Sequence, residues 1–186
     1  MLALLLFVAA CSREIPHGPG EIAPDEPAQE DVDDDSPFSH GDYELTPLAS
    51  YSLVARVLAR REYHRDAGAS LAPLDLAIGW GPMSDSAVLD KLTFTQNNRF
   101  FFWRTREFPI PRRDIETHAT NMHLIPADDE VAAVLADIEP GHVVSLQGLL
   151  VAAKRRDGFR WRSSLSRSDT GNGACELMYV QSVSYE

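Results

Sequence analysis

The sequence predicts an α+β fold with a mainly antiparallel sheet and two to three helices. Apolar residues recur at helical spacing in two segments of the chain. The last third instead alternates apolar and polar residues with a period of two, as β-strands do. Predicted helices and strands do not follow one another in regular alternation, and this argues against a parallel α/β sheet.

The composition fits one folded domain preceded by an acidic segment. The chain has 186 residues, of which 44% are hydrophobic, and its formal net charge is −11. Residues 1–50 contain 11 acidic residues and one base, whereas residues 51–186 contain 17 acidic and 16 basic residues. These values exclude a wholly disordered chain, a multi-span membrane protein and a generally basic nucleic-acid-binding protein.

The N-terminal residues predict where the protein is located in the cell. Residues 1–10 are uncharged and mostly apolar, too few to span a bilayer but the size of the apolar region of a secretory signal. The segment Val8-Ala9-Ala10-Cys11 resembles the lipobox of bacterial lipoproteins, in which the signal is removed before the cysteine and the thiol is lipidated. The resemblance implies a signal peptide at 1–10, lipidation at Cys11 and a cell-envelope location, with Ser12 favouring the outer membrane, facing the periplasm. The alternative is a cytoplasmic protein with an apolar N-terminus, since no Lys or Arg precedes the apolar run.

Residues 11–47 are predicted to form the lipid anchor, at Cys11, and an acidic, disordered tether that follows it. Like charges crowd residues 30–35, and apolar side chains are scarce, so little opposes the entropy cost of ordering. A single globular domain is then expected at 48–186. Prolines break the tether segment at Pro16, Pro19, Pro24, Pro27, Pro37 and Pro47.

The first half of the domain shows helical and strand patterns. Leu48, Tyr51, Val54 and Leu58 recur at spacings of three and four, which favours a helix. Gly81-Pro82 ends the strand that precedes it. We expect a helix at about 47–63, a strand at 74–80, a short helix from Ser84 or Asp85 to Leu92, a strand at 99–103 buried on both faces, and a helix at about 128–138.

The last third predicts three strands, within 144–150, 159–162 and 177–183, which are antiparallel if simply connected. Gly148 in mid-strand indicates a bulge or a sharp bend. The segment 141–151 is similar to the first strand of small Greek-key barrels of the OB type. A small OB-like barrel is therefore one candidate architecture within the expected α+β class.

Two polar segments and a basic cluster are the candidate sites. His118 and His123 lie five residues apart, and neither a helix nor a strand presents both on one face, so only a turn would pair them. The segment 161–176 carries hydroxyls, guanidinium groups, a carboxylate and the thiol of Cys175, a set that suits an anionic or polar ligand. The alternatives without a binding function are a polar loop for the histidine segment and a structural turn for the segment 161–176. The basic residues at 154–167 suit phosphate or carboxylate groups, with a solvated strand face as the alternative.

Residues 74–183 resemble a widespread family of uncharacterised bacterial lipoprotein-like proteins. The resemblance rests on the segments Trp80-Gly-Pro-Met83, His118-Ala-Thr-Asn-Met-His-Leu-Ile-Pro-Ala127 and Trp161-Arg-Ser-Ser-Leu-Ser-Arg-Ser-Asp-Thr-Gly-Asn-Gly-Ala-Cys-Glu176. It implies no activity, cofactor or ligand.

The leading hypothesis is therefore a lipid-anchored envelope protein whose domain binds an anionic envelope ligand or a protein partner in one polar pocket. The alternatives are an envelope hydrolase that uses His118 and His123 with a carboxylate, a metal or Cys175, and a structural assembly subunit. We expect no cofactor, no resident metal and no nucleic-acid partner. The expected ligand-binding residues are Trp80, His118, Asn121, His123, Ser163, Ser164, Arg167, Asp169, Asn172 and Glu176.

Overall fold

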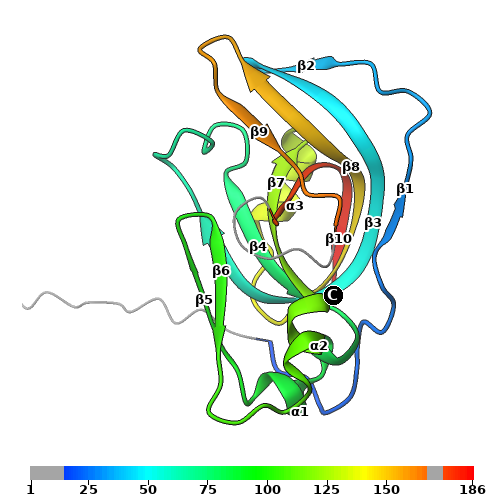
Figure 1. Cartoon of the computed structure of the whole chain (residues 1–186), viewed down its shortest axis with the longest axis vertical. Helices are drawn as coiled ribbons and strands as arrows, with labels where there is room; N and C mark the ends of the chain where they lie inside the picture. Colours follow the sequence, from blue (N-terminus) through cyan, green and yellow to red (C-terminus); the bar gives the residue numbers. More distant parts are fainter. Residues whose placement is uncertain (1–14, 167–173) are drawn as a thin grey trace, which may run out of the picture.

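The computed structural model describes residues 15–166 and 174–186, and it confirms an α+β fold with a mostly antiparallel sheet. An eight-stranded sheet carries the fold, and two further strands form a separate hairpin (Figure 1). The strands are β1 (Ala28–Glu30), β2 (Phe38–His40), β3 (Tyr43–Glu62), β4 (Leu74–Gly79), β5 (Thr93–Asn97), β6 (Phe100–Arg104), β7 (Ala119–Pro126), β8 (Val143–Arg155), β9 (Arg160–Arg162) and β10 (Glu176–Tyr185). The α-helices are α1 (Ser86–Leu89), α2 (Arg112–Thr117) and α3 (Asp129–Ala136), and a 3₁₀ turn spans Gly81–Ser84.

Five strands close into a ring in the order β3-β4-β7-β10-β8, because β8 pairs again with β3. Neighbouring strands are antiparallel except β7 and β10, which are parallel. Helix α3, between β7 and β8, packs against one end of the ring's core. The buried residues of this core include Leu53, Val57, Leu76, Ile78, Met122, Leu124, Leu135, Leu146 and Met178.

The helix predicted at 47–63 is wrong, since these residues belong to the 20-residue strand β3. Ala49, Tyr51, Leu53, Ala55 and Val57 are all buried and lie two residues apart, so a period of two competes with the helical spacing. Thirteen residues of the strand pair with β8, and tertiary pairing therefore decides between the two patterns. The register shifts after Pro47, where a bulge accommodates the missing N–H of a proline.

The disordered tether predicted for residues 11–47 is also wrong over its described part, residues 15–47. This segment runs along the domain, where β1 and β2 both pair with β3. Ala23 is only 1% exposed, and the N–H groups of Ile22 and Ala23 donate to Ser84 Oγ at 3.1 Å. The prolines are compatible with this arrangement because an extended segment at a sheet edge can do without some of its donors. The domain therefore begins well before residue 48.

A chain that starts at Leu48 should consequently be much less stable than one that starts at Ile15. It would lose the buried side chains of Tyr43 and Leu45, which are 5% and 0% exposed. At about 1.5–3 kcal/mol for each buried side chain, the loss is about 3–6 kcal/mol, a large share of a typical domain's stability. Thermal unfolding of both chains measures the difference. Equal midpoints would restore the interpretation as a tether.

Other predicted elements agree with the structure in part. The strand at 74–80 is β4, and the helix at 128–138 is α3, whose N-cap Asp128 accepts a hydrogen bond from Val131 N at 2.9 Å. Asp85 caps the short α1. The strand at 99–103 is β6, but it is not buried on both faces: it pairs only with β5, and Phe102 is 49% exposed.

The three C-terminal strands are confirmed as β8, β9 and β10, with β8 antiparallel to both others. The segment likened to a first barrel strand is β8, which comes fourth among the strands of the ring. The predicted irregularity at Gly148 lies across the ladder, where the register of β10 shifts between Val180 and Ser182. Among the described residues, no helix is long and apolar enough to cross a membrane.

Candidate functional site

A tight hairpin between β5 and β6 delivers one arginine to the outer face of the ring. Asn97 pairs with Phe100, so Asn98 and Arg99 alone form the turn. Both have positive φ angles, 51° and 69°, as a two-residue type I′ turn requires. Arg99 occupies a position that usually favours glycine, and its contacts must offset this backbone strain.

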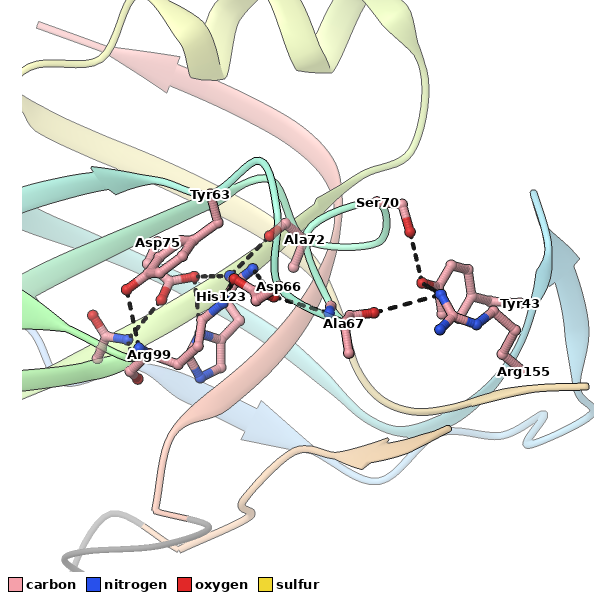
Figure 2. A network of polar contacts seen from close by, with 12 residues as sticks. Tyr43, Tyr63, Asp66, Ala67, Ser70, Ala72, Asp75, Arg99, His123 and Arg155 are labelled. Atoms are coloured by element: carbon pink, nitrogen blue, oxygen red, sulfur yellow. Dashed lines mark hydrogen bonds and ion pairs between the residues drawn. The ribbon is translucent and has the colours of Figure 1, made fainter. Parts of the chain in front are cut away.

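The guanidinium of Arg99 is held from several sides (Figure 2). It donates to both carboxylate oxygens of Asp66, at 3.0 and 3.1 Å, and to Asp75 Oδ1 at 2.7 Å. It also donates to the carbonyl of Ala72 at 2.9 Å and lies 3.7 Å from the centre of the Tyr63 ring. Its backbone N–H donates to Tyr63 Oη at 3.0 Å. These contacts fix the hairpin tip against the β3–β4 connection.

Beneath Arg99, polar side chains are buried on the outer face of the ring. Asp75 on β4 and His123 on β7 are direct cross-strand partners, and their relative exposures are 0% and 2%. His123 Nδ1 lies 2.9 Å from Asp75 Oδ1, although the contact lacks the angles of a hydrogen bond. Asn121 donates to Asp75 Oδ2 at 3.3 Å and to the carbonyl of Arg99 at 3.1 Å. Asp75 thus contacts both Arg99 of the hairpin and the β7 residues Asn121 and His123, and so joins the hairpin to the ring.

A pocket of about 940 Å³ opens beside this network. It is lined by residues 61–68 of the β3–β4 connection, residues 97–100 of the hairpin tip and residues 159–162 around β9, together with His123 and Cys175. Trp161 forms part of its wall, and its ring centre lies 4.6 Å from that of His123. Gly68 packs so closely on Trp161 that a Cβ there would lie 2.5 Å from the ring. The volume lies within the range of small-molecule sites.

The charges around the pocket are unbalanced. Its two acids are both in ion pairs: Glu62 with Arg60 at 2.5 Å, and Asp66 with Arg99. Four exposed arginines have side chains that make no hydrogen bond or ion pair with another described residue. These arginines, which all line the pocket, are Arg61, Arg65, Arg160 and Arg162.

The ion pair with Arg99 makes the site sensitive to acid. Partial burial alone would raise the pKa of Asp66, but hydrogen bonds from Arg99 and Gly68, with the charge of Arg99, lower the pKa below its ordinary value. A lowered folded-state pKa means that this stabilisation is present above the unfolded pKa and is lost as the pH falls through the folded one. We expect the difference in unfolding free energy between wild type and Asp66→Asn to be constant near neutral pH and to shrink as the pH falls below about 3.9, the ordinary pKa of aspartate. A difference that does not shrink in acid would contradict this assignment.

The structure divides the predicted single pocket. Trp80 is 2% exposed and packs against His118, with ring centres 6.4 Å apart. His118 ends α2, and its Nδ1 is 2.9 Å from the carbonyl of Asp114. Trp80 and Glu176 border a crevice of about 20 Å³, room for about one water, and neither they nor His118 line the large pocket. His118 and His123 therefore do not form a pair, since His123 lines the large pocket and His118 does not.

The remaining predicted residues fall into two groups. Asn121 and His123 belong to the network under Arg99, and His123 is the one predicted ligand-binding residue within the described ranges that lines the large pocket. Ser163 and Ser164 are buried and bond to backbone groups, and Glu176 accepts from Thr120 Oγ1 at 2.5 Å. Among the described residues, no cluster of three or more His, Cys, Asp or Glu side chains fits a metal ion. Cys11, Arg167, Asp169 and Asn172 lie outside the described residues.

Sequence reasoning missed Arg99, Asp75 and the residues of the β3–β4 connection. Two signals were present. Asn97-Asn98 interrupts alternating residues before an aromatic run, and asparagine tolerates positive φ, which is typical of a hairpin turn. Asp75 is a lone acid in the apolar strand 74–79, and a buried acid needs a partner.

Comparisons of the chain with protein-family profiles, with curated proteins and with solved structures gave no match.

Proposed function

We propose that this domain binds an anionic ligand in the pocket beside Arg99 and does so at the cell envelope. The observation that carries the proposal is a set of pocket arginines whose side chains have no hydrogen-bond or ion-pair partner among the described residues, beside acids that are already paired. These arginines are Arg61, Arg65, Arg160 and Arg162. An unpaired guanidinium presents a planar fork of donors that matches carboxylate and phosphate groups. The rings of Tyr63, Phe159 and Trp161 add apolar faces for the non-ionic part of a ligand.

The position of the pocket in the fold supports this proposal. The ring has the strand order of OB folds, with its third and fifth strands parallel and a helix between the third and fourth. OB folds bind oligonucleotides and oligosaccharides at the face of their second and third strands, near the loops after the first and fourth. The pocket lies at the corresponding place, between the β3–β4 connection and the segment that follows β8. This support is an analogy of fold.

The proposed location at the cell envelope depends on lipidation of Cys11. Because residues 15–47 pack on the domain, only residues 12–14 separate the proposed anchor from the described structure. Four residue steps span at most about 14 Å. The domain would then lie directly at the membrane surface. Metabolic labelling with a fatty acid tests this part: wild type should be labelled and Cys11→Ser should not.

Binding can be tested with the full chain and two simple probes, digalacturonate and inorganic phosphate. We expect Trp161 fluorescence to change on titration, and Arg61→Gln/Arg162→Gln to weaken binding at least tenfold, because a hydrogen bond to a charged group contributes about 1.5–3 kcal/mol. Arg113→Gln is the matched control, an exposed arginine on α2 that does not line the pocket. Equal affinities in the double variant and the control would contradict the proposal, as would no binding of either probe.

Hydrolysis is a second candidate function, favoured by one observation. His123 beside Asp75 and the thiol of Cys175 border the same pocket, so an imidazole base and a nucleophile share one site. His118 takes no part in this version. Ester hydrolysis by wild type that is abolished in both His123→Gln and Cys175→Ser would support it, and unchanged rates in Cys175→Ser would exclude the thiol mechanism.

A further inference from the structure

A second pocket adjoins the first and shares Arg160 with it. This pocket has a volume of about 780 Å³ and is lined by residues 41–44 at the start of β3, residues 154–157 at the end of β8, Ser39 and Arg160. Arg160 also lines the pocket beside Arg99. The two pockets are therefore neighbours that meet at Arg160.

Polar contacts join Tyr43, Ser70 and Arg155 at the edge of the second pocket (Figure 2). Arg155 Nη1 donates to Tyr43 Oη at 2.6 Å, and Tyr43 Oη lies 2.8 Å from Ser70 Oγ. The Arg155 guanidinium lies 5.1 Å from the ring centres of both Tyr43 and Phe159. Because Phe159 lines the first pocket and Tyr43 the second, this stack connects the linings of the two pockets.

The charges of the second pocket repeat the pattern of the first. Lys154 is paired with Glu44 at 2.6 Å, and Arg155 with Asp157 at 2.8 Å. Exposed Arg156 and Arg160 make no side-chain hydrogen bond or ion pair with another described residue, and Asp42 is the pocket's remaining acid.

Three of the arginines that have no side-chain partner among the described residues lie close together in the sequence, between residues 156 and 162. Arg160 and Arg162 lie two residues apart in β9, so they point to the same face at a spacing of about 6.6 Å. Arg156 lies in the β8–β9 turn and lines the second pocket. Several arginines in succession suit a ligand with repeated anionic groups rather than one small anion.

We propose that the two pockets are successive subsites for one elongated ligand, an acidic polysaccharide that crosses Arg160. This inference rests on the proposed function of the first pocket. A polysaccharide fits better than a nucleic-acid duplex because the chain carries a formal net charge of −11. Such a charge repels the dense phosphate charge of a duplex at long range, one charge per about 1.7 Å, whereas an acidic polysaccharide carries about one charge per sugar ring. Aromatic faces beside the arginines can pack on sugar rings.

The test is the dependence of affinity on chain length, with galacturonate oligomers from the di- to the octasaccharide and the full chain. We expect affinity to rise with length in wild type. Arg156→Gln should remove about tenfold of the affinity for the octasaccharide and leave the disaccharide affinity unchanged. Arg61→Gln should weaken every length alike, and Arg113→Gln none.

The outcomes separate the two proposals. Disaccharide binding that depends on Arg61 but does not strengthen with length would overturn the elongated ligand and leave the anion pocket in place. An equal loss for both lengths in Arg156→Gln would also overturn it. Tighter binding of a single-stranded oligonucleotide with the same number of charges would replace the polysaccharide with a nucleic acid. No binding at any length would overturn both proposals.

Discussion

Replacement of Arg99 by alanine should destabilise the domain by about 3–5 kcal/mol, the cost of leaving a buried charge without its partner. The side chain of Asp75 is 0% exposed, and its 2.7 Å ion pair with Arg99 is the main compensation for its charge. Asn121 would still donate to Asp75 at the longer distance of 3.3 Å. Alanine would also keep the positive φ of 69° at this position, so the strain would persist without the contacts that offset it.

The loss should be local in structure and measurable in two ways. Denaturant unfolding gives the change in stability, and hydrogen exchange should show amides of β5 and β6 opening before those of the ring, because Arg99 fixes the hairpin tip. Ligand affinity should fall with it, since residues 97–100 line the pocket. Arg104→Ala is the matched control: this exposed arginine of the same hairpin makes no side-chain hydrogen bond or ion pair with another described residue, so it should cost at most about 0.5 kcal/mol.

A double variant separates the buried charge from lost packing. If the uncompensated carboxylate is the main cost, Asp75→Asn in the Arg99→Ala background should recover about 1–3 kcal/mol, because it removes the charge that has lost its partner. No recovery would mean that Arg99 acts through its stacking on Tyr63 and through the turn. A single Arg99→Ala variant as stable as Arg104→Ala would contradict the role assigned to this network.

The parts of the fold that could be predicted are those in which local pattern and tertiary structure agree. Helix α3 has an apolar stripe, a capping aspartate and a Pro-Gly stop, and it forms where the sequence places it. Strand β3 is the opposite case, because its residues fit both a period of 3.6 and a period of two. Pairing with β8 on one side and β4 on the other selects the strand, and no local window of sequence contains that information.

The site was harder to predict than the fold because it is assembled from distant segments. His123 was named from the sequence, but not Asp75, its cross-strand partner 48 residues earlier, or Arg99, which pairs with Asp75 from the hairpin tip; only the β4–β7 register and the hairpin bring these residues together. The acidic N-terminal segment was wrongly predicted to be disordered for a related reason. Its composition resembles that of a disordered chain, yet its backbone groups bond to Ser84, Asp85 and β3, which composition does not reveal.

Gly148 should be the position where the smallest change has the largest effect on the ring. It lies in β8 opposite Val180 and Tyr51, between the two strands that flank β8. A Cβ built there would lie 2.0 Å from the carbonyl oxygen of Tyr179 and 3.1 Å from Gln181 N. Both are backbone atoms of β10 next to its bulge, so no side-chain rotation can relieve the overlap. Gly148→Ala must therefore push β10 away from β8 and strain the closure of the ring.

We expect Gly148→Ala to cost about 3 kcal/mol, the upper end of what overpacked positions show, because the obstacle is backbone rather than a flexible side chain. Gly18→Ala is the control, since nothing lies within 4 Å of its Cβ position. Denaturant unfolding of the two variants measures the difference, and hydrogen exchange should place the weakening at the paired amides of β8 and β10. If the two alanine variants unfold at the same denaturant concentration, the close approach of β10 to Gly148 is not required for the fold, and the glycine must serve the bend of β8 alone.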